Sequence, residues 1–294
     1  MTADEGALDA GTQGAHAAVV LRRAQEAIGA QLRGVRRLGV AFSGGVDSST
    51  LVALAARILG PEQVVAVLGV SPSLAADERL AAHKVAAVIG VRVVELATQE
   101  GAVAAYAANG PDRCFHCKNE LFATISAEVV ASENLDAVAY GENADDSRRP
   151  DRPGAAAAVA HQVLRPLADA GLTKADVRAI ARELGLPCAD KPAAPCLASR
   201  IPHFSLVTPQ KLRQVDRAEQ LVRGLGFSDG RVRHHGDIAR VELPAAELAR
   251  ATTEPIRRAL VDGLLAQGFR YVALDLVGIQ SGAFTMDQLR SGHG

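Results

Sequence analysis

The chain has 294 residues, of which 48% are hydrophobic and 22% charged, and its formal net charge is −1. A chain of this length can bury a sizeable core, and we expect it to form two domains. The near-neutral charge argues against a general nucleic-acid-binding surface, and no segment reaches the ~18 uninterrupted apolar residues of a membrane helix. Residues 1–15 lack the basic and apolar regions of a signal peptide and are expected to be the disordered leader of a cytoplasmic protein.

Strands and helices alternate along the first two thirds of the chain. The spacing of apolar residues predicts a helix over 16–32, a strand over 37–42, a helix ending at residue 59, a strand over 63–70, a helix over 74–89 and a strand over 91–96. A helix over 111–131, strands over 135–140 and 163–167, and a helix from 173 to about 185 follow. This order predicts an α/β fold whose parallel sheet carries helices on both faces, and we place the domain at 16–208.

A smaller domain is expected over residues 209–294. The segment before it, 187–209, contains five prolines and should form an irregular, functional loop. The predicted elements of the smaller domain are a helix over 211–225, strands over 231–235 and 238–243, a helix over 245–265 and a strand over 271–276. Antiparallel pairing of the strands, with the helices on one side, would give an α+β module that binds substrate or mediates oligomerisation.

Residues 43–48 read SGGVDS and follow the first predicted strand directly. Glycines allow a tight turn there, and the hydroxyls and N–H groups at the start of the next helix can bind phosphate. The lysine of a Walker A loop is missing. The segment matches instead the SGGxDS signature of the PP-loop ATP pyrophosphatases, which implies that it binds the pyrophosphate of ATP. A strand, turn and helix without a ligand is the alternative interpretation.

The residues expected to bind ATP and Mg²⁺ lie in this loop and after a later strand. The loop offers hydroxyls and backbone N–H groups from Ser43, Gly44, Gly45, Ser48 and Ser49. Asp47 is expected to hold Mg²⁺, because a hard cation on phosphate takes one or two carboxylates. Asp145 and Asp146 end the strand over 135–140 and would hold more Mg²⁺ or position the acceptor, with solvated loop acids as the alternative.

The cysteines are the second group of candidate residues. Cys114 and Cys117 form a CxxC pair at a predicted helix N-terminus, where the helix dipole favours thiolate. The pair alone could be half a zinc site, a redox pair or a coincidence. Cys196 lies in the proline-rich loop near Arg200, whose guanidinium would favour thiolate and could hold a phosphate or carboxylate. A buried, inert cysteine is the alternative for Cys196.

A third group is basic. Arg231 and Arg233 alternate on one face of a predicted strand, and they are candidate ligands of a substrate phosphate. Glu219, on the preceding predicted helix, is a possible partner for them. A solvated face of an edge strand would need no such function.

Taken together, these motifs closely resemble the LarE family over roughly residues 31–278. The motifs that carry the resemblance are SGGVDS at 43–48, RCxxCK at 113–118, GxNADD at 141–146, GLTK at 171–174, KPA at 191–193, PCLASRIP at 195–202 and RVR at 231–233. Family members are ATP-dependent sulfur transferases that build the nickel-pincer cofactor of lactate racemase.

The resemblance implies a two-step reaction in which Asp47, Asp145 and Cys196 are catalytic. ATP would adenylylate a carboxylate of pyridinium-3,5-biscarboxylic acid mononucleotide with release of pyrophosphate, and sulfur would then replace AMP. In one form of the family Cys196 gives up its own sulfur and becomes dehydroalanine. In the form that this sequence favours, Cys114, Cys117 and Cys196 hold a 4Fe–4S cluster whose open iron carries the sulfide.

Several alternatives stay open at this stage. A zinc site made by all four cysteines, including Cys188, would leave no open iron. Another PP-loop enzyme could capture the adenylylated acceptor with ammonia as an amide ligase, or act as a tRNA thiolase. A nucleotide-binding sensor without turnover would bind ATP and release no pyrophosphate. We expect a homo-oligomer of unspecified size, with a small-molecule substrate and neither a nucleic-acid nor a membrane partner.

Overall fold

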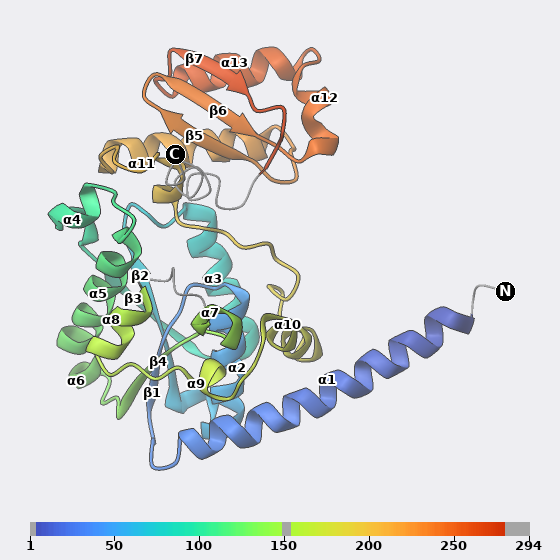
Figure 1. Cartoon of the computed structure of the whole chain (residues 1–294), viewed down its shortest axis with the longest axis vertical. Coiled ribbons are helices and arrows are strands. Elements are labelled where there is room, and N and C mark those ends of the chain that lie inside the picture. Colours follow the sequence, from blue (N-terminus) through green and yellow to red (C-terminus); the bar gives the residue numbers. More distant parts are fainter. Residues whose placement is uncertain (1–3, 149–153, 280–294) are drawn as a thin grey trace, which may run out of the picture. The chain divides into compact units, whose positions relative to one another are not determined.

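The computed structural model describes residues 4–148 and 154–279, with side chains from residue 17 onward. The chain divides into two compact units (Figure 1). Unit 1 consists of Met1–Ser71, Ala76–Glu100 and Cys114–Ala194, and unit 2 consists of Pro72–Ala75, Gly101–Arg113 and Pro195–Gly294. Unit 2 therefore takes in much of the proline-rich loop and two earlier segments, in addition to the residues from 209 onward.

Unit 1 contains the expected parallel sheet, which has four strands. The strands are β1 (Leu38–Ala41), β2 (Val64–Val70), β3 (Arg92–Ala97) and β4 (Ala137–Tyr140), and their order is β3-β2-β1-β4. In the central strand, Leu38 pairs with Val64 on one side and with Ala137 on the other. The carboxyl ends of β1 and β4 therefore lie next to each other, and both lead into predicted site residues.

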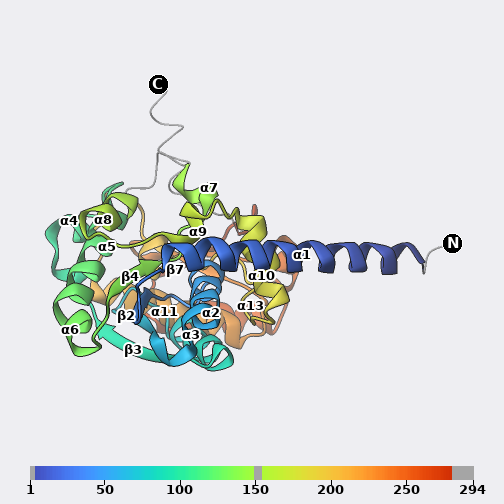
Figure 2. The same ribbon diagram turned by 90° about the horizontal axis from the view of Figure 1, so that it is seen from below.

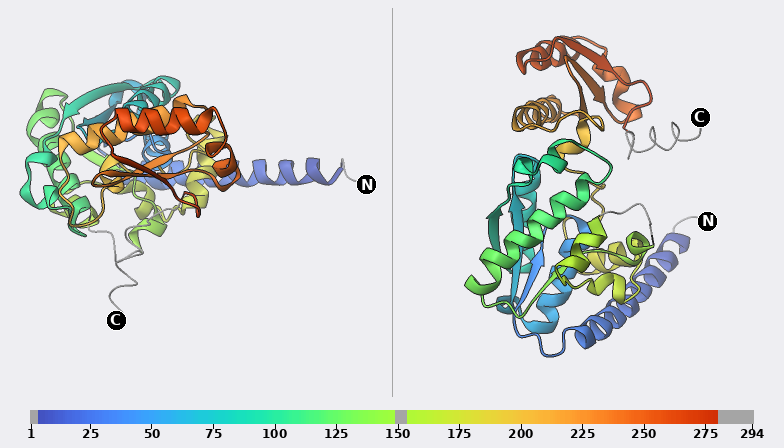
Figure 3. Two further views of the ribbon diagram at one scale, coloured as in Figure 1. Left: turned by 90° about the horizontal axis from the view of Figure 1, so that it is seen from above. Right: turned by 60° about the vertical axis from the view of Figure 1, so that its left-hand side comes forward.

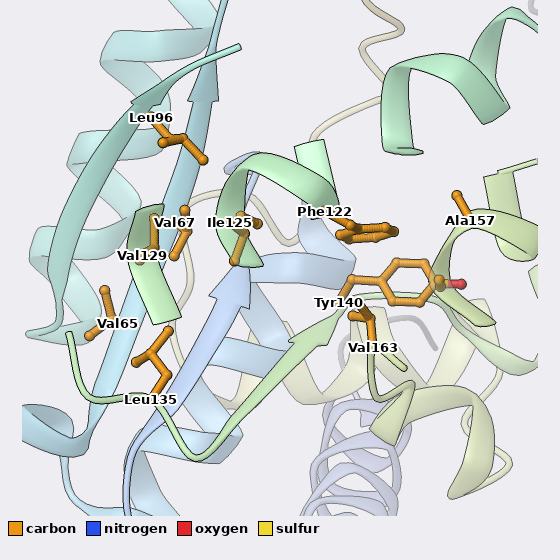
Figure 4. Close-up of a cluster of buried hydrophobic side chains, with 11 residues drawn as sticks. Val65, Val67, Leu96, Phe122, Ile125, Val129, Leu135, Tyr140, Ala157 and Val163 are labelled. Atoms are coloured by element: carbon orange, nitrogen blue, oxygen red, sulfur yellow. The ribbon is translucent and has the colours of Figure 1, made fainter. Parts of the chain in front are cut away.

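Helices cover both faces of this sheet. On one face α2 (Val46–Leu59) contacts β1 and β2, and α3 (Ala76–Ile89) contacts β2 and β3. On the other face a hydrophobic cluster joins the strands to α5 (Arg113–Thr124) and to the π-helix η3 (Ile125–Val129) that continues it (Figure 4). The larger members of that cluster are Val65, Val67, Leu96, Phe122, Ile125, Val129, Leu135, Tyr140 and Val163.

The first helix, α1 (Asp4–Gln31), packs on unit 1 through its carboxyl-terminal half. It contacts α2, α9 (Pro166–Asp169) and α10 (Lys174–Glu183), and Figure 2 shows it running past them. Val20, Ala24 and Ile28 are buried at helical spacing on the packed side. The helix begins at Asp4, within the segment expected to be a disordered leader.

Other predicted elements of unit 1 differ in detail. The strand predicted over 163–167 is a single bridge between Leu164 and Ala139, because α9 begins at Pro166. The helix predicted over 111–131 is divided into α5, η3 and α6 (Val130–Ser132). Short helices that the periodicity did not indicate are α7 (Ala144–Ser147) and α8 (Gly154–Ala160) in unit 1 and α4 (Ala104–Ala107) in unit 2. Short 3₁₀ turns occur at η1 (Pro61–Gln63) and at η2 (Glu100–Ala102).

Unit 2 contains a mixed sheet of three strands in the order β5-β6-β7. The strands are β5 (Arg231–His235), β6 (Ile238–Glu242) and β7 (Tyr271–Leu274). β5 and β6 are antiparallel, but β6 and β7 are parallel, so the expectation of wholly antiparallel pairing is wrong. The chain between β6 and β7 passes through helices, and such a crossover brings the next strand in parallel.

Helices α11 (Pro209–Gly224) and α13 (Ile256–Ala266) contact each other and share one hydrophobic cluster with this sheet (Figure 3). The helix predicted over 245–265 is three pieces, η5 (Ala245–Glu247), α12 (Leu248–Ala251) and α13. The interruption falls just before Pro255, which has no N–H to continue a helix. Among the described residues, no helix is long and apolar enough to cross a membrane.

Candidate active site

The phosphate loop connects the end of β1 to the start of α2. Gly44 has a φ of +70°, which residues with a Cβ rarely adopt. A Cβ atom at this position would lie 2.7 Å from the Cα atom of Ala82 on α3. Both conformation and space therefore require glycine at position 44, and they bring the loop against α3.

The serines of the loop hold its shape. The Ser48 hydroxyl accepts a hydrogen bond from the Ser43 N–H at 3.2 Å and donates to the Gly45 carbonyl at 3.2 Å. The Ser43 hydroxyl lies 3.2 Å from that of Ser48 and accepts from the Gly45 N–H at 3.3 Å. Ser49 is fully buried, and its Oγ has no partner among the described residues. Ser43 and Ser48 therefore face the loop, whereas Ser49 is enclosed.

Asp47 lies at the centre of a charged network. Its Oδ2 atom is 2.5 Å from the ammonium nitrogen of Lys174, the first residue of α10. Its Oδ1 atom accepts a hydrogen bond from the Asn143 amide at 3.1 Å, and the same Nδ2 donates to Asp146 Oδ2 at 2.9 Å. Asn143 thus brings the carboxylates of Asp47 and Asp146 together, which fits two ligands for one Mg²⁺ on phosphate.

The loop after β4 packs closely against the phosphate loop. A Cβ atom at Gly141 would lie 2.6 Å from the Ser48 backbone nitrogen, so only glycine permits this approach. The Asn143 side chain caps α7 by accepting from the backbone N–H groups of Asp145 and Asp146, both at 3.0 Å. The Asp145 carboxylate accepts from the Lys174 backbone N–H at 2.8 Å. Asp145 thus orients α10, the helix that carries the lysine.

A pocket of about 220 Å³ opens beside the loop. Its lining includes Ser43, Gly45, Asp47 and Ser48 together with Phe42, Leu121, Phe122 and Tyr140. The Lys118 ammonium lies 4.5 Å from the centre of the Tyr140 ring. Burial, and then the negative charge of Glu142, raise the pKa of Tyr140, so its phenol stays protonated. The pocket therefore combines phosphate-binding groups with an aromatic wall and a cation.

In unit 2, Cys196 is an exposed residue that immediately precedes the 3₁₀ turn η4 (Leu197–Arg200). The backbone on both sides of it is hydrogen-bonded. The Arg200 guanidinium donates to the Pro195 carbonyl at 2.9 Å, and the Leu197 N–H donates to the Ser73 carbonyl at 2.9 Å. An accessible thiol on a fixed backbone is suited to nucleophilic attack.

The other cysteines differ in exposure. Cys114 is exposed and Cys117 half-buried on the first turns of α5 in unit 1, as the CxxC pattern predicts. Cys188 is buried, which is typical of an inert cysteine. Among the described side chains, no three His, Cys, Asp or Glu residues are arranged to hold a metal ion. The assignment of Cys114, Cys117 and Cys196 as cluster ligands stays a prediction.

Comparison with known proteins identifies the family. A family model for asparagine synthase matches residues 20–126, the region of the phosphate loop. A pyridinium-3,5-bisthiocarboxylic acid mononucleotide synthase of Lactiplantibacillus plantarum is 34% identical over 263 residues, which cover 86% of this chain and 90% of that protein. The chain belongs to the LarE family. It is therefore an ATP-dependent sulfur transferase with a PP-loop domain.

Two further relatives match a similar share of the chain. An uncharacterized protein of Synechocystis is 41% identical over 83% of this chain and 90% of its own length. An uncharacterized protein of Methanocaldococcus jannaschii is 25% identical over 82% of this chain and 90% of its own length.

The arginines predicted as substrate ligands have carboxylate partners in this LarE protein. Arg200 donates to Glu219 through Nε at 2.7 Å and through NH2 at 3.1 Å. Arg233 donates to Glu242 through the same two nitrogens, both at 2.9 Å. Burial lowers the pKa of Arg200, but the charge of Glu219 and its hydrogen bonds together raise it above the ordinary value. Glu219 is therefore the partner of Arg200, and it also accepts from the Val232 N–H at 3.1 Å.

Arg231 lies in a different electrostatic environment. It is 5% exposed, and burial, followed by the charges of Arg200 and Arg233, lowers its pKa. The charges of Asp229 and Glu242 act in the opposite direction and raise the pKa of Arg231. The assignment of Arg231 as a ligand of a substrate phosphate stays a prediction.

Some functional residues had no individual prediction. Lys174 and Asn143 lie within motifs of the LarE resemblance, but nothing in their spacing shows that they contact Asp47. Lys174 is 127 positions from Asp47 in the chain. Tyr140 ends a predicted strand, and Lys118 follows the CxxC pair; only the fold brings them to the same pocket. A signal existed for Asn143, since Asn before two Asp residues is typical of a helix cap.

Proposed function

We propose that the protein converts pyridinium-3,5-biscarboxylic acid mononucleotide into its thiocarboxylate at the expense of ATP. The observation that carries the proposal is the phosphate loop with Asp47 beside an open pocket, in a chain of the LarE family. The synthase of Lactiplantibacillus plantarum is named for the corresponding bisthiocarboxylic acid product. We expect the reaction to take place in the cytoplasm, and a homo-oligomer stays a prediction.

The first step activates the carboxylate. The substrate carboxylate oxygen attacks the α-phosphorus of ATP, the bond to the β-phosphate bridge breaks, and pyrophosphate leaves with the electron pair. Asp47 and Asp146 would hold Mg²⁺, which would neutralise negative charge on the phosphates, and the loop N–H groups and hydroxyls would bind pyrophosphate. The Lys174 ammonium, 2.5 Å from Asp47, would donate a hydrogen bond to a phosphate oxygen. The product is an acyl-adenylate, whose AMP is a good leaving group.

The second step delivers sulfur. The Cys196 thiolate attacks the acyl carbon and AMP departs, which leaves a thioester between substrate and protein. In the sacrificial route, a base removes the Cα proton of Cys196 and the Cβ–S bond breaks. The sulfur and its electron pair remain on the substrate as thiocarboxylate, and the protein retains dehydroalanine. This route turns over once for each Cys196.

The alternative sulfur source spares Cys196. A 4Fe–4S cluster held by Cys114, Cys117 and Cys196 would supply a sulfide as the sulfur donor. The exposure of Cys114 and Cys196 and the partial exposure of Cys117 support their availability as ligands. The burial of Cys188 supports three ligands over four and makes a four-cysteine zinc site less favourable.

The test follows both products with protein purified without oxygen. Iron, sulfide and zinc are measured first, and the protein then receives ATP, Mg²⁺ and the biscarboxylic acid mononucleotide. We expect pyrophosphate release and thiocarboxylate formation, neither of which occurs without ATP. A loss of about 34 Da at Cys196, the mass of H₂S, would establish sacrifice, whereas repeated turnover with unchanged mass and bound iron would establish the cluster route.

Control variants separate this function from its rivals. Cys196→Ala should retain pyrophosphate release and lose thiocarboxylate formation, whereas Asp47→Ala should lose both. A PP-loop amide ligase would keep full activity without Cys196 and require ammonia. A tRNA thiolase would require tRNA as the acceptor. A nucleotide sensor would bind ATP and release no pyrophosphate with any of these acceptors.

A further inference from the structure

The segment before the CxxC pair contains an asparagine with an unusual number of backbone contacts. Asn109 follows α4, is fully buried, and has a φ of +60°. Its Nδ2 atom lies 2.7 Å from the Pro202 carbonyl, 3.0 Å from that of Ser205 and 3.2 Å from that of Ile201. Two amide N–H groups thus serve three carbonyls of the segment that follows Cys196.

The main chain of Asn109 binds the same segment. Its carbonyl accepts from the Phe204 N–H at 3.1 Å, and a ring nitrogen of His203 lies 3.2 Å from it. Two residues earlier, the Ala107 carbonyl accepts from the Val207 N–H at 2.9 Å. Residues 107–109 therefore pair with residues 201–207 through side chain and backbone, although neither segment is a regular strand.

Arg113 extends these contacts to the turn that contains Cys196. Its NH1 group donates to Asn109 Oδ1, and also to the Ala198 carbonyl at 3.0 Å. Arg113 is 8% exposed, so both bonds are shielded from water. Through Arg113, Asn109 thereby connects the backbone of Ala198 with the backbone of residues 201–205.

A loop with several prolines has few internal hydrogen bonds, and its buried carbonyls need donors from elsewhere. Asn109 supplies them, and it also tolerates the left-handed conformation better than most residues with a Cβ. Nothing in the chemistry of activation requires this arrangement, because Asn109 belongs to unit 2 and the phosphate loop to unit 1. The contacts are directed at the position of the Cys196 turn.

We propose that Asn109 is the positioning residue of the sulfur-transfer step, which rests on the proposed function. Its amide fixes the backbone around Cys196, so that the thiol is held where it can attack or bind. Loss of the amide leaves one buried and two half-buried carbonyls with fewer donors and loosens the turn. The adenylylation step does not depend on that turn.

The experiment compares the wild type with Asn109→Gly, Asn109→Ala and Asn109→Asp in single turnover of the full chain. Asn109→Gly accepts the positive φ but has no amide, and Asn109→Asp keeps the shape and loses the donor. The matched control is Asn134→Ala, because Asn134 has a φ of +51° and is exposed in the turn before β4. It removes an asparagine from the same conformation without touching the Cys196 turn.

We expect all three Asn109 variants to form thiocarboxylate about a hundredfold more slowly than the wild type, the scale of a 1 Å misplacement. Pyrophosphate release and the KM for ATP should stay within about twofold, since activation does not use the turn. Amide hydrogen exchange should rise about tenfold or more at residues 197–207 only. Asn134→Ala should behave as the wild type in every measurement.

Three results would overturn the proposal. Wild-type sulfur transfer in Asn109→Gly would show that only the backbone conformation matters. Equal losses of pyrophosphate release and sulfur transfer, with faster exchange throughout the chain, would show a general structural role. If the wild type itself transfers no sulfur, the proposed function fails, and exchange at residues 197–207 decides alone whether Asn109 holds the turn. Unchanged exchange there would reject that role.

Discussion

The Lys174 ammonium lies 2.5 Å from the Asp47 carboxylate, at the place where the phosphate loop is expected to receive Mg²⁺. Thr173 caps α10 in a capping box with Asp176, and Asp145 binds the Lys174 backbone N–H. The backbone of Lys174 is therefore fixed at the start of α10. Its ammonium neutralises Asp47 before the cation binds, and it is near enough to contact a phosphate in place of Asp47.

Replacement of Lys174 by methionine keeps most of the apolar stem and removes the charge. We expect the KM for Mg·ATP to rise about tenfold, because a charge-assisted contact to phosphate is lost. Mg²⁺ should also bind the nucleotide-free protein more tightly, since Asp47 is no longer neutralised. Steady-state pyrophosphate release and a Mg²⁺ titration measure the two effects. The control, Lys84→Met at an exposed position on α3, should change neither the KM nor the Mg²⁺ affinity. Tighter ATP binding in Lys174→Met would contradict the role of Lys174 as a phosphate contact.

Gly44→Ala tests the fit of the loop against α3. We expect the unfolding free energy to fall by about 1–3 kcal/mol, because the new Cβ atom would clash with Ala82 and because the φ is positive. We also expect the variant to lose ATP binding. Gly185→Ala is the control, since Gly185 also has a positive φ, of 65°, but its Cβ would have no neighbour within 4 Å. Denaturant titration should show a lower unfolding free energy in both variants. ATP titration should show lost binding only in Gly44→Ala.

Arg231 and Arg233 should respond differently to the same substitution. Arg231→Gln is expected to raise the KM of the mononucleotide about tenfold or more, through loss of a charged hydrogen bond to its phosphate. Arg233→Gln should instead lower the unfolding free energy by about 1–3 kcal/mol, because the buried Glu242 loses one of two arginine partners and retains Arg240 at 3.2 Å. Kinetics and denaturant titration of each variant check this. A stable Arg233→Gln protein with a raised KM would reverse the two roles.

Stability should fall between pH 7 and pH 5, in part because of His234. Burial, then the charge of Lys211, lowers the pKa of His234, so the folded imidazole stays neutral where the unfolded one binds a proton. The unfolded state then binds an extra proton as the pH falls below ~6.5. The free energy of unfolding therefore decreases by up to about 1.4 kcal/mol per pH unit for one histidine. His235, whose pKa is also lowered, adds an effect of the same sign.

The measurement is denaturant titration at several pH values for the wild type and for His234→Gln. Glutamine does not titrate and can keep a hydrogen bond to Gln214, which lies 3.1 Å from the His234 ring nitrogen. We expect a shallower decline from pH 7 to pH 5 in the variant. An equal slope in the two proteins would remove His234 from the explanation.

The features predicted best from sequence were those that local physics determines. The strand, glycine turn and helix around residues 38–59 follow from periodicity and from the conformational freedom of Gly44. The helix start at Thr173 was confirmed, with Asp176 in place of the usual Glu of a capping box. Each of these depends on residues within a few positions of one another.

Pairings between distant residues could not be predicted in the same way. The parallel alignment of β7 depends on how the helices between β6 and β7 pack, which the spacing of apolar residues does not specify. The pairing of Glu219 with Arg200 was also not anticipated, because several arginines lie within reach of one carboxylate. For the contact between Lys174 and Asp47, the helix cap at Thr173 is a local feature that the sequence indicates. The placement of α10 beside α2 is long-range and could not be predicted from it.

The π-helix η3 determines which side of α5 the CxxC pair occupies. A five-residue turn of this kind places one more residue in a helical turn than an α-helix does. Ile125 and Val129 anchor it in the cluster of unit 1, while Cys114 and Cys117 lie at the amino end of the same continuous helix. Deleting one residue within Ile125–Val129 would restore ordinary α-helical spacing and rotate the cysteines by about 100° relative to that anchor. Phe122, in α5 just before η3, is buried in the same cluster, so α5 and η3 together set the direction in which the two thiols point.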